Sequence, residues 1–187
     1  RLQMLGDDLN LMAANYDFVL LDLGAGVERT VRQLAHNAGT CAVLLTDEPT
    51  SLTDAYAFIK VTLAERPEVN FQVVANGVNS TREGERTYNT LLKACQGFLK
   101  ISPPLLGTIR RDPRVKEAIR NQIPLLTRYP NTEAAGRLAL VVKTLGIETV
   151  VEPIGPVTPG TTYFKDDGKT TWWFHHTHLE FLSGHKK

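Results

Sequence analysis

No apolar run in this sequence approaches the ~20 residues that a membrane-spanning helix needs. Cysteine is scarce: only Cys41 and Cys95 occur, one in a strand-like run and one in a helix-like run. This usage argues against a secreted disulfide scaffold and suits a reducing cytoplasm. A net charge of +1 also excludes a chain-wide electrostatic field directed at nucleic acid or at an acidic substrate.

What the sequence does have is the composition of a soluble globular protein, with 42% hydrophobic and 22% charged residues. Its 187 residues are enough for one domain with a substantial core. Residues 1–5 have the pattern of the middle of an amphipathic helix, with no capping residue before them. We therefore expect the chain to be a piece of a longer protein.

Short apolar runs alternate with helical patterns along most of the chain, which predicts an α/β fold with a mainly parallel sheet. Continuous apolar runs predict buried strands, and apolar residues at helical spacing or capping residues predict helices. Ser51 and Asp54 have the S-x-x-D spacing of a capping box. The predicted strands are 18–21, 41–45, 71–75 and 105–108. The predicted helices are 2–14, 28–36, 51–63, 83–99 and 132–145. A further helix is predicted to begin at Pro113, with Asp112 as its cap.

Polar side chains follow three of these predicted strands. Asp22, Asp47 and Asn76 each come where an apolar run ends. In parallel α/β sheets, ligands bind outside the carboxyl ends of the strands. The sequence therefore predicts a binding site at this edge of the sheet.

The chain changes character near Gly146. Residues 147–187 are rich in proline, hold both tryptophans and four of the five histidines, and show no helical period. We treat them as a tail of unknown role that follows a domain spanning 1–146. His176 and His178 are candidate ligands for Zn²⁺ or Ni²⁺, although no cysteine or acidic partner completes the set. An aromatic anchor at a membrane surface is the alternative for this tail.

The segment Leu21 to Gly26, L-D-L-G-A-G, is compatible with two functions. One is the glycine-rich turn of a methyltransferase that uses S-adenosylmethionine, with Asp47 or Glu48 as the acid for the ribose hydroxyls. Against this interpretation, the third glycine position of that turn is Glu28, whose side chain crowds the ligand. The dinucleotide fingerprint G-x-G-x-x-G fails as well, because its last position is Arg29.

The second interpretation is an apolar strand that ends in D-x-x-x-G, the pattern of a Walker B strand and its switch II turn. Asp22 then binds Mg²⁺ through water, because that ion keeps much of its hydration shell. The backbone N–H of Gly26 contacts the γ-phosphate, and glycine permits the close approach. The local alternative is an aspartate that only caps a turn.

The remainder of the chain resembles the MinD/ParA-type P-loop ATPases, in particular the FlhG/FleN flagellar-number regulators. Residues 46–60, T-D-E-P-T-S-L-T-D-A-Y-A-F-I-K, resemble the region after the next strand in those regulators. Residues 73–78, V-V-A-N-G-V, resemble the family's strand that ends in asparagine. Residues 106–112, L-G-T-I-R-R-D, resemble the following strand and helix start. The resemblance spans about residues 16–145 and favours the ATPase over the methyltransferase.

This resemblance implies a three-layer α/β/α domain of the P-loop NTPase type, truncated at its amino end. It also implies ATP and Mg²⁺ as cofactors, with Asp22 positioning Mg²⁺ and Gly26 contacting the γ-phosphate. The Asn76 amide, which offers a donor and an acceptor together, would recognise adenine. Arg110 stands where the family usually has proline, and it would line the adenine pocket through its backbone or stack its guanidinium on the base.

Two parts of the family's machinery for hydrolysis are absent from these residues: the P-loop of the form G-K-G-G-x-G-K-[ST] and the switch I aspartate. Phosphoryl transfer depends on positioning and charge stabilisation by such groups. We therefore expect the intact protein to be an ATPase and this chain alone not to hydrolyse ATP. A non-catalytic interaction module of the same fold is the alternative, which the sequence upstream of Arg1 would distinguish.

The resemblance further implies an ATP-dependent homodimer with regulatory protein partners in the cytoplasm, with peripheral contact at the inner face of the membrane left open. The run P-T-S-L-T-D-A-Y favours a role in flagellar number or placement, and division-site placement (MinD) and DNA partition (ParA) are the alternatives. A solvated face is the simplest interpretation of the basic residues, although a local nucleic-acid surface stays open. These residues are Lys60, Arg110, Arg111, Arg114 and Lys116.

Overall fold

The structure is a computed structural model that describes residues 2–16, 18–24, 26–146, 165–166, 170–173 and 182–184. By its internal packing the chain divides into two compact units. The unit Leu23–Arg111, called here the sheet unit, contains a parallel sheet and the helices that cover it. The second unit consists of Arg1–Asp22 and Asp112–Lys187.

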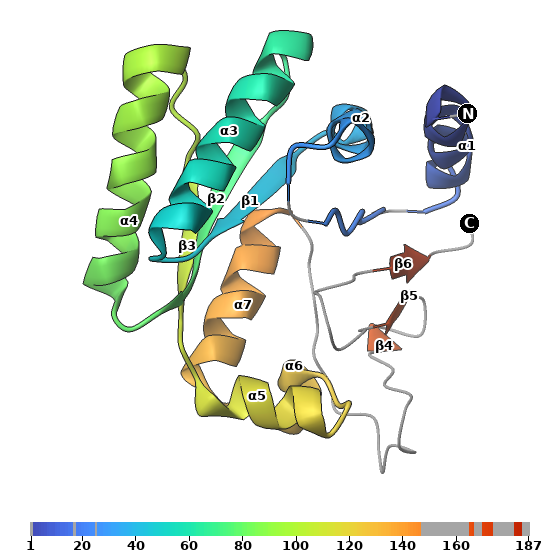
Figure 1. The fold of residues 1–187 in the computed structure, drawn as a ribbon. Coiled ribbons are helices and arrows are strands. Elements are labelled where there is room, and N and C mark those ends of the chain that lie inside the picture. Colours follow the sequence, from blue (N-terminus) through green and yellow to red (C-terminus); the bar gives the residue numbers. More distant parts are fainter. Residues whose placement is uncertain are drawn as a thin grey trace. The chain divides into compact units, whose positions relative to one another are not determined.

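The sheet unit is built on three parallel strands in the order β1-β2-β3 (Figure 1). Their bounds are β1 Cys41–Leu45, β2 Phe71–Val78 and β3 Leu105–Arg110. Strand β2 is buried on both faces, because Val73 on one face is fully buried and Val74 on the other is 3% exposed. The predicted α/β fold with a parallel sheet is confirmed.

Helices α3 (Pro49–Glu65) and α4 (Thr81–Ala94) lie against this sheet, and α2 (Arg29–Asn37) packs beside α3 (Figure 1). A π-helical turn, η1 (Cys95–Leu99), continues α4 and is followed by Lys100 in the left-handed conformation. The apolar residues between these helices and the sheet form one core. Its fully buried members include Leu45, Ile59, Val73 and Cys95.

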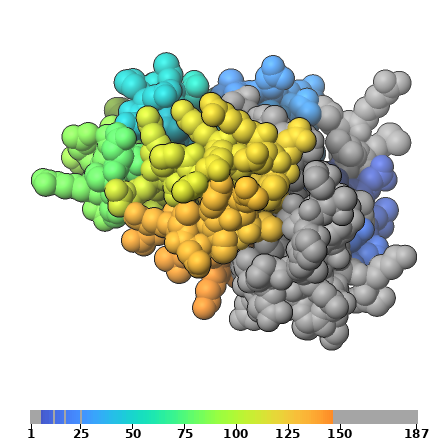
Figure 2. All heavy atoms as spheres, turned by 90° about the horizontal axis from the view of Figure 1, so that it is seen from below, coloured from blue at the N-terminus to red at the C-terminus, as the bar shows by residue number. Residues whose placement is uncertain are grey.

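The second unit contains four helices among its described residues. They are α1 (Leu2–Ala13), α5 (Pro113–Arg120), α6 (Leu125–Arg128) and α7 (Glu133–Thr144). Three short antiparallel strands follow, which are β4 (Lys165–Asp166), β5 (Thr170–Trp173) and β6 (Leu182–Gly184). Figure 2 shows the chain as spheres, with α5 and α6 in yellow and α7 in orange.

The start of α5 is as predicted. The Asp112 carboxylate accepts a hydrogen bond from the Arg114 N–H at 2.8 Å, and Pro113 is the first helical residue. In the next turn, the Arg114 guanidinium lies 2.7 Å from the Glu117 carboxylate and 4.9 Å from the centroid of the Tyr129 ring. These contacts hold α5 and α6 together.

Residues 18–21, predicted as a buried strand, form no strand in the structure. These residues are only partly buried, and none pairs with a strand of the described residues. A strand is defined by the ladder that pairs its backbone N–H and C=O groups. Apolar composition therefore does not suffice to make this run a strand, and Asp22 does not lie at a strand end.

The other predicted elements differ in smaller ways. Strand β1 was predicted to be buried on both faces, but it is covered on one, and Leu44 is 48% exposed. Strand β2 continues to Val78, so Asn76 lies inside the strand and not after it. The short helix α6 was not predicted.

Helix α3, predicted from residue 51, begins at Pro49 with Glu48 at the cap position. The predicted capping box of Ser51 and Asp54 is therefore wrong, because both residues lie inside the helix. The Ser51 hydroxyl instead accepts a hydrogen bond from the Thr46 N–H at 3.0 Å. Proline determines the start because its fixed φ is helical and its missing N–H has no helical partner at that position.

No helix among the described residues is long and apolar enough to cross a membrane. The described residues also contain no group of three or more histidine, cysteine or acidic side chains that could hold a metal ion. His176 and His178 lie outside the described residues.

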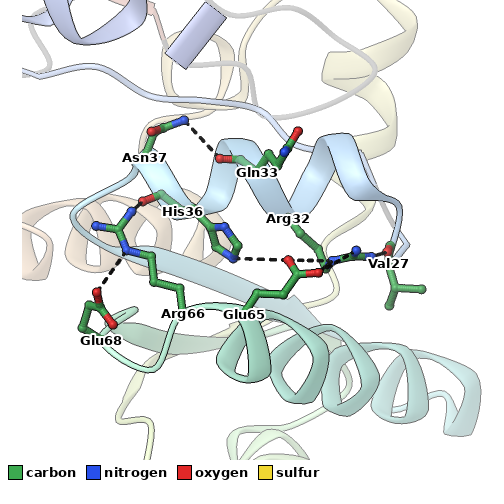
Figure 3. A network of polar contacts seen from close by, with 8 residues as sticks. All are labelled: Val27, Arg32, Gln33, His36, Asn37, Glu65, Arg66 and Glu68. Carbon is green, nitrogen blue, oxygen red and sulfur yellow. Dashed lines mark hydrogen bonds and ion pairs between the residues drawn. The ribbon is translucent and has the colours of Figure 1, made fainter. Parts of the chain in front are cut away.

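Two arginines join α2 to the carboxyl-terminal end of α3 (Figure 3). The Arg32 guanidinium donates to the Glu65 carboxylate, with its Nη2 at 2.8 Å and its Nε at 3.1 Å from both oxygens. Arg66 donates to the carbonyl of His36 in the last turn of α2 and lies 3.6 Å from Glu68. The His36 Nε2 atom lies 3.7 Å from the Glu65 carboxylate.

This network lowers the pKa of Glu65. Its largest cause is the hydrogen bond from Arg32, and the nearby positive charges of Arg32, His36 and Arg29 add to it. A carboxylate whose pKa is lowered on folding contributes stability above its unfolded pKa, and that stability is lost as the pH falls through the folded pKa.

Helix α4 lies so close to the sheet that only glycine fits at position 84. A Cβ atom added to Gly84 would lie 2.4 Å from the Thr108 Cγ2 atom on β3 and 3.3 Å from the Ala75 Cβ on β2. Both neighbours are buried and belong to paired strands. The close approach of this helix to the sheet therefore depends on the absence of a side chain.

We expect Gly84→Ala to lower the free energy of unfolding by about 1–3 kcal/mol, because the methyl group overpacks a buried contact. Denaturant unfolding followed by circular dichroism measures this change. Gly136→Ala is the matched control, since that helical glycine has open space around it, and alanine should leave stability equal or higher. A Gly84→Ala protein as stable as the wild type would contradict the packing.

We expect Glu65→Gln to weaken the acid sensitivity of the chain. The wild type should lose the contribution of the Arg32–Glu65 pair as the pH falls, whereas the variant has already lost it and should show a shallower decrease in melting temperature. Melting temperatures measured between about pH 6 and about pH 3 test this. Glu85→Gln, an exposed position on α4, is the control and should follow the wild type. Parallel curves for wild type and Glu65→Gln would refute the prediction.

Candidate functional site

The carboxyl ends of the three strands meet at one edge of the sheet unit. In the pairing of β1 with β2, Leu45 is opposite Ala75, and in the pairing of β2 with β3, Asn76 is opposite Ile109. The loop with Asp47 therefore begins beside the end of β2. This is the edge at which parallel α/β sheets bind ligands.

Asn76 lies at this edge, half-buried and one residue before a bend in β2. The bend is at Gly77, which has φ +66°, and the register shifts between Asn76 and Val78. Among the described residues, the Asn76 amide has no hydrogen-bond partner. Its donor and acceptor are therefore both available to a ligand.

Arg110, the last residue of β3, lies beside the same bend. It is paired in register with Val78 and is exposed, and its Nε donates to the Asn79 carbonyl at 3.4 Å. Its neighbour Arg111 donates from Nε to the Gly77 carbonyl at 3.2 Å. The structure therefore places Asn76 and Arg110, two of the predicted site residues, near the carboxyl ends of adjacent strands.

The loop after β2 is held by Glu83, in the first turn of α4. The Glu83 carboxylate accepts from the Asn79 N–H at 2.7 Å, and the Ser80 hydroxyl accepts from the Glu83 N–H at 3.1 Å. The Asn79 backbone bond is the largest cause of the lowered pKa of Glu83. Glu83 therefore connects the loop after β2 to the start of α4.

Gly26 lies in the loop before α2, in the same unit. Its φ of +114° is a conformation that residues with a side chain adopt only with strain. No other atom lies within 4 Å of where its Cβ would be. The D-x-x-x-G pattern thus places glycine where the backbone conformation requires it.

Asp22 is the last residue of the first stretch of the second unit, and it is exposed. A single exposed carboxylate suits Mg²⁺, which takes one or two protein carboxylates and keeps several waters. The sequence predicted that Asp22 would follow the end of a strand, but residues 18–21 form no strand.

Sequence reasoning missed Arg32 and Glu65. Arg32 also donates to the carbonyl of Val27, which directly follows Gly26 (Figure 3). Arg32 and Glu65 are 33 residues apart, so no local spacing rule could have connected them.

Comparison with known proteins gives sequence relatives over about two thirds of the chain. FleN of Pseudomonas aeruginosa PAO1, an antiactivator, is 31% identical over 121 residues, which is 65% of this chain and 43% of that protein. The flagellum site-determining protein YlxH of Helicobacter pylori is 31% identical over 120 residues, 63% of this chain and 40% of that protein. An uncharacterized ATP-binding protein of Methanocaldococcus jannaschii is 25% identical over 64% of this chain and 42% of its own length. The chain thus spans about two fifths of the curated relatives it matches.

Solved structures show the same fold. A MinC:MinD cell division complex of Aquifex aeolicus matches with a TM-score of 0.62 at 18% identity, covering 84% of this chain and 62% of the matched chain. The cell division ATPase MinD of Pyrococcus furiosus matches with a TM-score of 0.63 at 17% identity, covering 78% and 58%. No family model matches. Over the part that these proteins match, the chain is similar in sequence to the flagellar regulators FleN and YlxH and has the fold of the MinD proteins.

Proposed function

We propose that the protein carrying this chain is an ATP-binding and ATP-hydrolysing switch that regulates the number or placement of flagella. The observation that carries the proposal is the 31% identity to FleN and to YlxH over about 120 residues each. The fold likeness to MinD supports the nucleotide-binding architecture. The flagellar role is supported by the two sequence relatives.

The residues at the sheet edge fit an adenine base. The Asn76 amide offers a donor and an acceptor, as the edge of adenine does, and it has no partner among the described residues. Arg110 on the neighbouring strand supplies either backbone contact or a guanidinium face for stacking. Because β2 is paired on both sides, the backbone that carries the amide is held in place before the base arrives.

The phosphate end of the nucleotide is assigned to Gly26 and Asp22. The positive φ and the open surroundings of Gly26 let its N–H approach a γ-phosphate. Asp22 would hold Mg²⁺, which neutralises charge on the phosphates, through water. The remaining phosphate contacts require a P-loop, so the protein to test is the full-length product of the gene that encodes this chain.

The output of the switch is proposed to be a protein partner controlled by an ATP-dependent homodimer. FleN is named an antiactivator, and the Aquifex MinD is seen in complex with MinC. Both names describe proteins that act through another protein. We place the protein in the cytoplasm, with peripheral contact at the inner face of the membrane as part of the same proposal.

In the full-length product, we expect Asn76→Ala to weaken ATP binding by roughly 5- to 30-fold, the loss of one or two hydrogen bonds to the base. Asp22→Asn should leave ATP binding nearly intact and reduce Mg²⁺-dependent hydrolysis to background. Binding of a fluorescent ATP analogue and release of phosphate measure the two effects. Asn89→Ala, the same change on the exposed face of α4, is the control for binding. Unchanged affinity in Asn76→Ala would remove this residue from the site.

Deleting the gene should change the number or position of flagella, and electron microscopy of negatively stained cells counts them. The Asn76→Ala allele should reproduce the deletion, whereas the Asn89→Ala allele should not. Normal flagella with minicells would indicate division-site placement instead, and normal flagella with loss of plasmids would indicate DNA partition.

A further inference from the structure

The turn that contains Gly26 is tied to a distant part of the sheet unit through a single side chain. Arg32, in the second turn of α2, donates from Nη1 to the Val27 carbonyl. Its other nitrogens, Nε and Nη2, hold the carboxylate of Glu65 at 2.8–3.1 Å (Figure 3). Because Glu65 is the last residue of α3, one planar guanidinium connects the turn to the end of that helix.

The bond to the Val27 carbonyl restrains the peptide plane between Val27 and Glu28, which is the second plane after Gly26. A peptide unit is rigid, so fixing a carbonyl fixes the orientation of the whole plane. Gly26 itself, with φ +114° and no atom near its missing Cβ, remains the point where the chain can rotate. Only the φ and ψ of Val27 lie between Gly26 and this plane, and a residue with a side chain has less backbone freedom than glycine. A change at Gly26 that Val27 does not absorb must therefore move Arg32 or break its bond to Val27.

A second arginine joins the same two helices without contacting the turn. Arg66 donates to the His36 carbonyl at the opposite end of α2 and pairs with Glu68. Arg32 and Arg66 thus both hold α2 against the end of α3, but only Arg32 contacts the segment after Gly26. Arg66 can therefore serve as a control for helix packing, and Arg32 tests the contact with the turn.

Stability alone does not account for the arrangement around Arg32. The side chains of Arg32 and Glu65 are 17% and 40% exposed, and ion pairs that reach solvent make a measurable but modest contribution to folding. A bidentate contact between a guanidinium and a carboxylate, in contrast, fixes the orientation of the guanidinium plane. The remaining nitrogen is then aimed at one carbonyl.

We propose that Arg32 is a positioning residue that couples the Gly26 turn to the carboxyl-terminal end of α3. A change of the turn between ATP and ADP is thereby transmitted to the surface formed by residues 62–68. The inference rests on the proposed function, because it requires a protein that binds both nucleotides.

The experiment uses the full-length gene product with Mg²⁺ and either a non-hydrolysable ATP analogue or ADP. Hydrogen–deuterium exchange of the peptides that cover residues 62–68 is the readout. In the wild type, exchange should differ between the two nucleotides. In Arg32→Ala, and in Arg32→Lys, which keeps the charge but has one nitrogen, this difference should fall about fivefold or more, while both nucleotides still bind.

Two further variants separate coupling from stability. Arg66→Ala should lower the melting temperature and keep the nucleotide-dependent difference in exchange. The double variant Arg32→Glu with Glu65→Arg swaps the two charges. It restores an ion pair between the helices and leaves the Val27 carbonyl without its donor. It should recover the melting temperature and still lack the difference in exchange.

The proposal is overturned if Arg32→Ala or Arg32→Lys retains the full nucleotide-dependent difference in hydrogen exchange, or if the charge-swapped double variant restores that difference. A wild type that binds both nucleotides and shows no difference at residues 62–68 overturns it as well. A wild type that binds neither nucleotide refutes the proposed function itself and removes the basis of the coupling.

Discussion

The pairing of β2 on both sides is the constraint on which the rest of the sheet unit depends. Strand β2 hydrogen-bonds to β1 and to β3, and its side chains are buried on both faces. The close contact of Gly84 with Ala75 and Thr108 then fixes α4 on the sheet. Because register and helix position follow from this one strand, Asn76 and Arg110 have little freedom at its carboxyl end.

Most of this arrangement could be predicted from local sequence signals. The apolar run of β2 and the cap formed by Asp112 and Pro113 are short-range patterns with a direct physical meaning, and the structure confirms them. The positive φ of Gly26 was not predicted, because this glycine was assigned from the sequence to contact with a γ-phosphate. Asn76 was predicted at the correct edge, although β2 continues two residues beyond it.

The errors occur where a long-range partner or a competing local signal decides the outcome. Residues 18–21 have the composition of a strand but no strand pairs with them among the described residues. At the start of α3 two local signals competed, and Pro49 determined the start where Ser51 and Asp54 had been expected to do so. The bond between Arg32 and Glu65 has no local signature, since the two residues meet only after α2 packs on α3.

A nucleotide switch needs one end of its site to be rigid and the other to be adjustable. The sheet unit has both properties, and they come from different kinds of interaction. Asn76 is held by the backbone ladder of a doubly paired strand, which changes only if the sheet opens. The segment after Gly26 is instead held through the side chain of Arg32 on the Val27 carbonyl. Water can replace a single side-chain hydrogen bond to a carbonyl far more easily than the backbone hydrogen bonds between paired strands. Under the proposed function, one nucleotide binds a fixed base site and alters the turn, because the backbone of Asn76 is held more rigidly than the segment after Gly26.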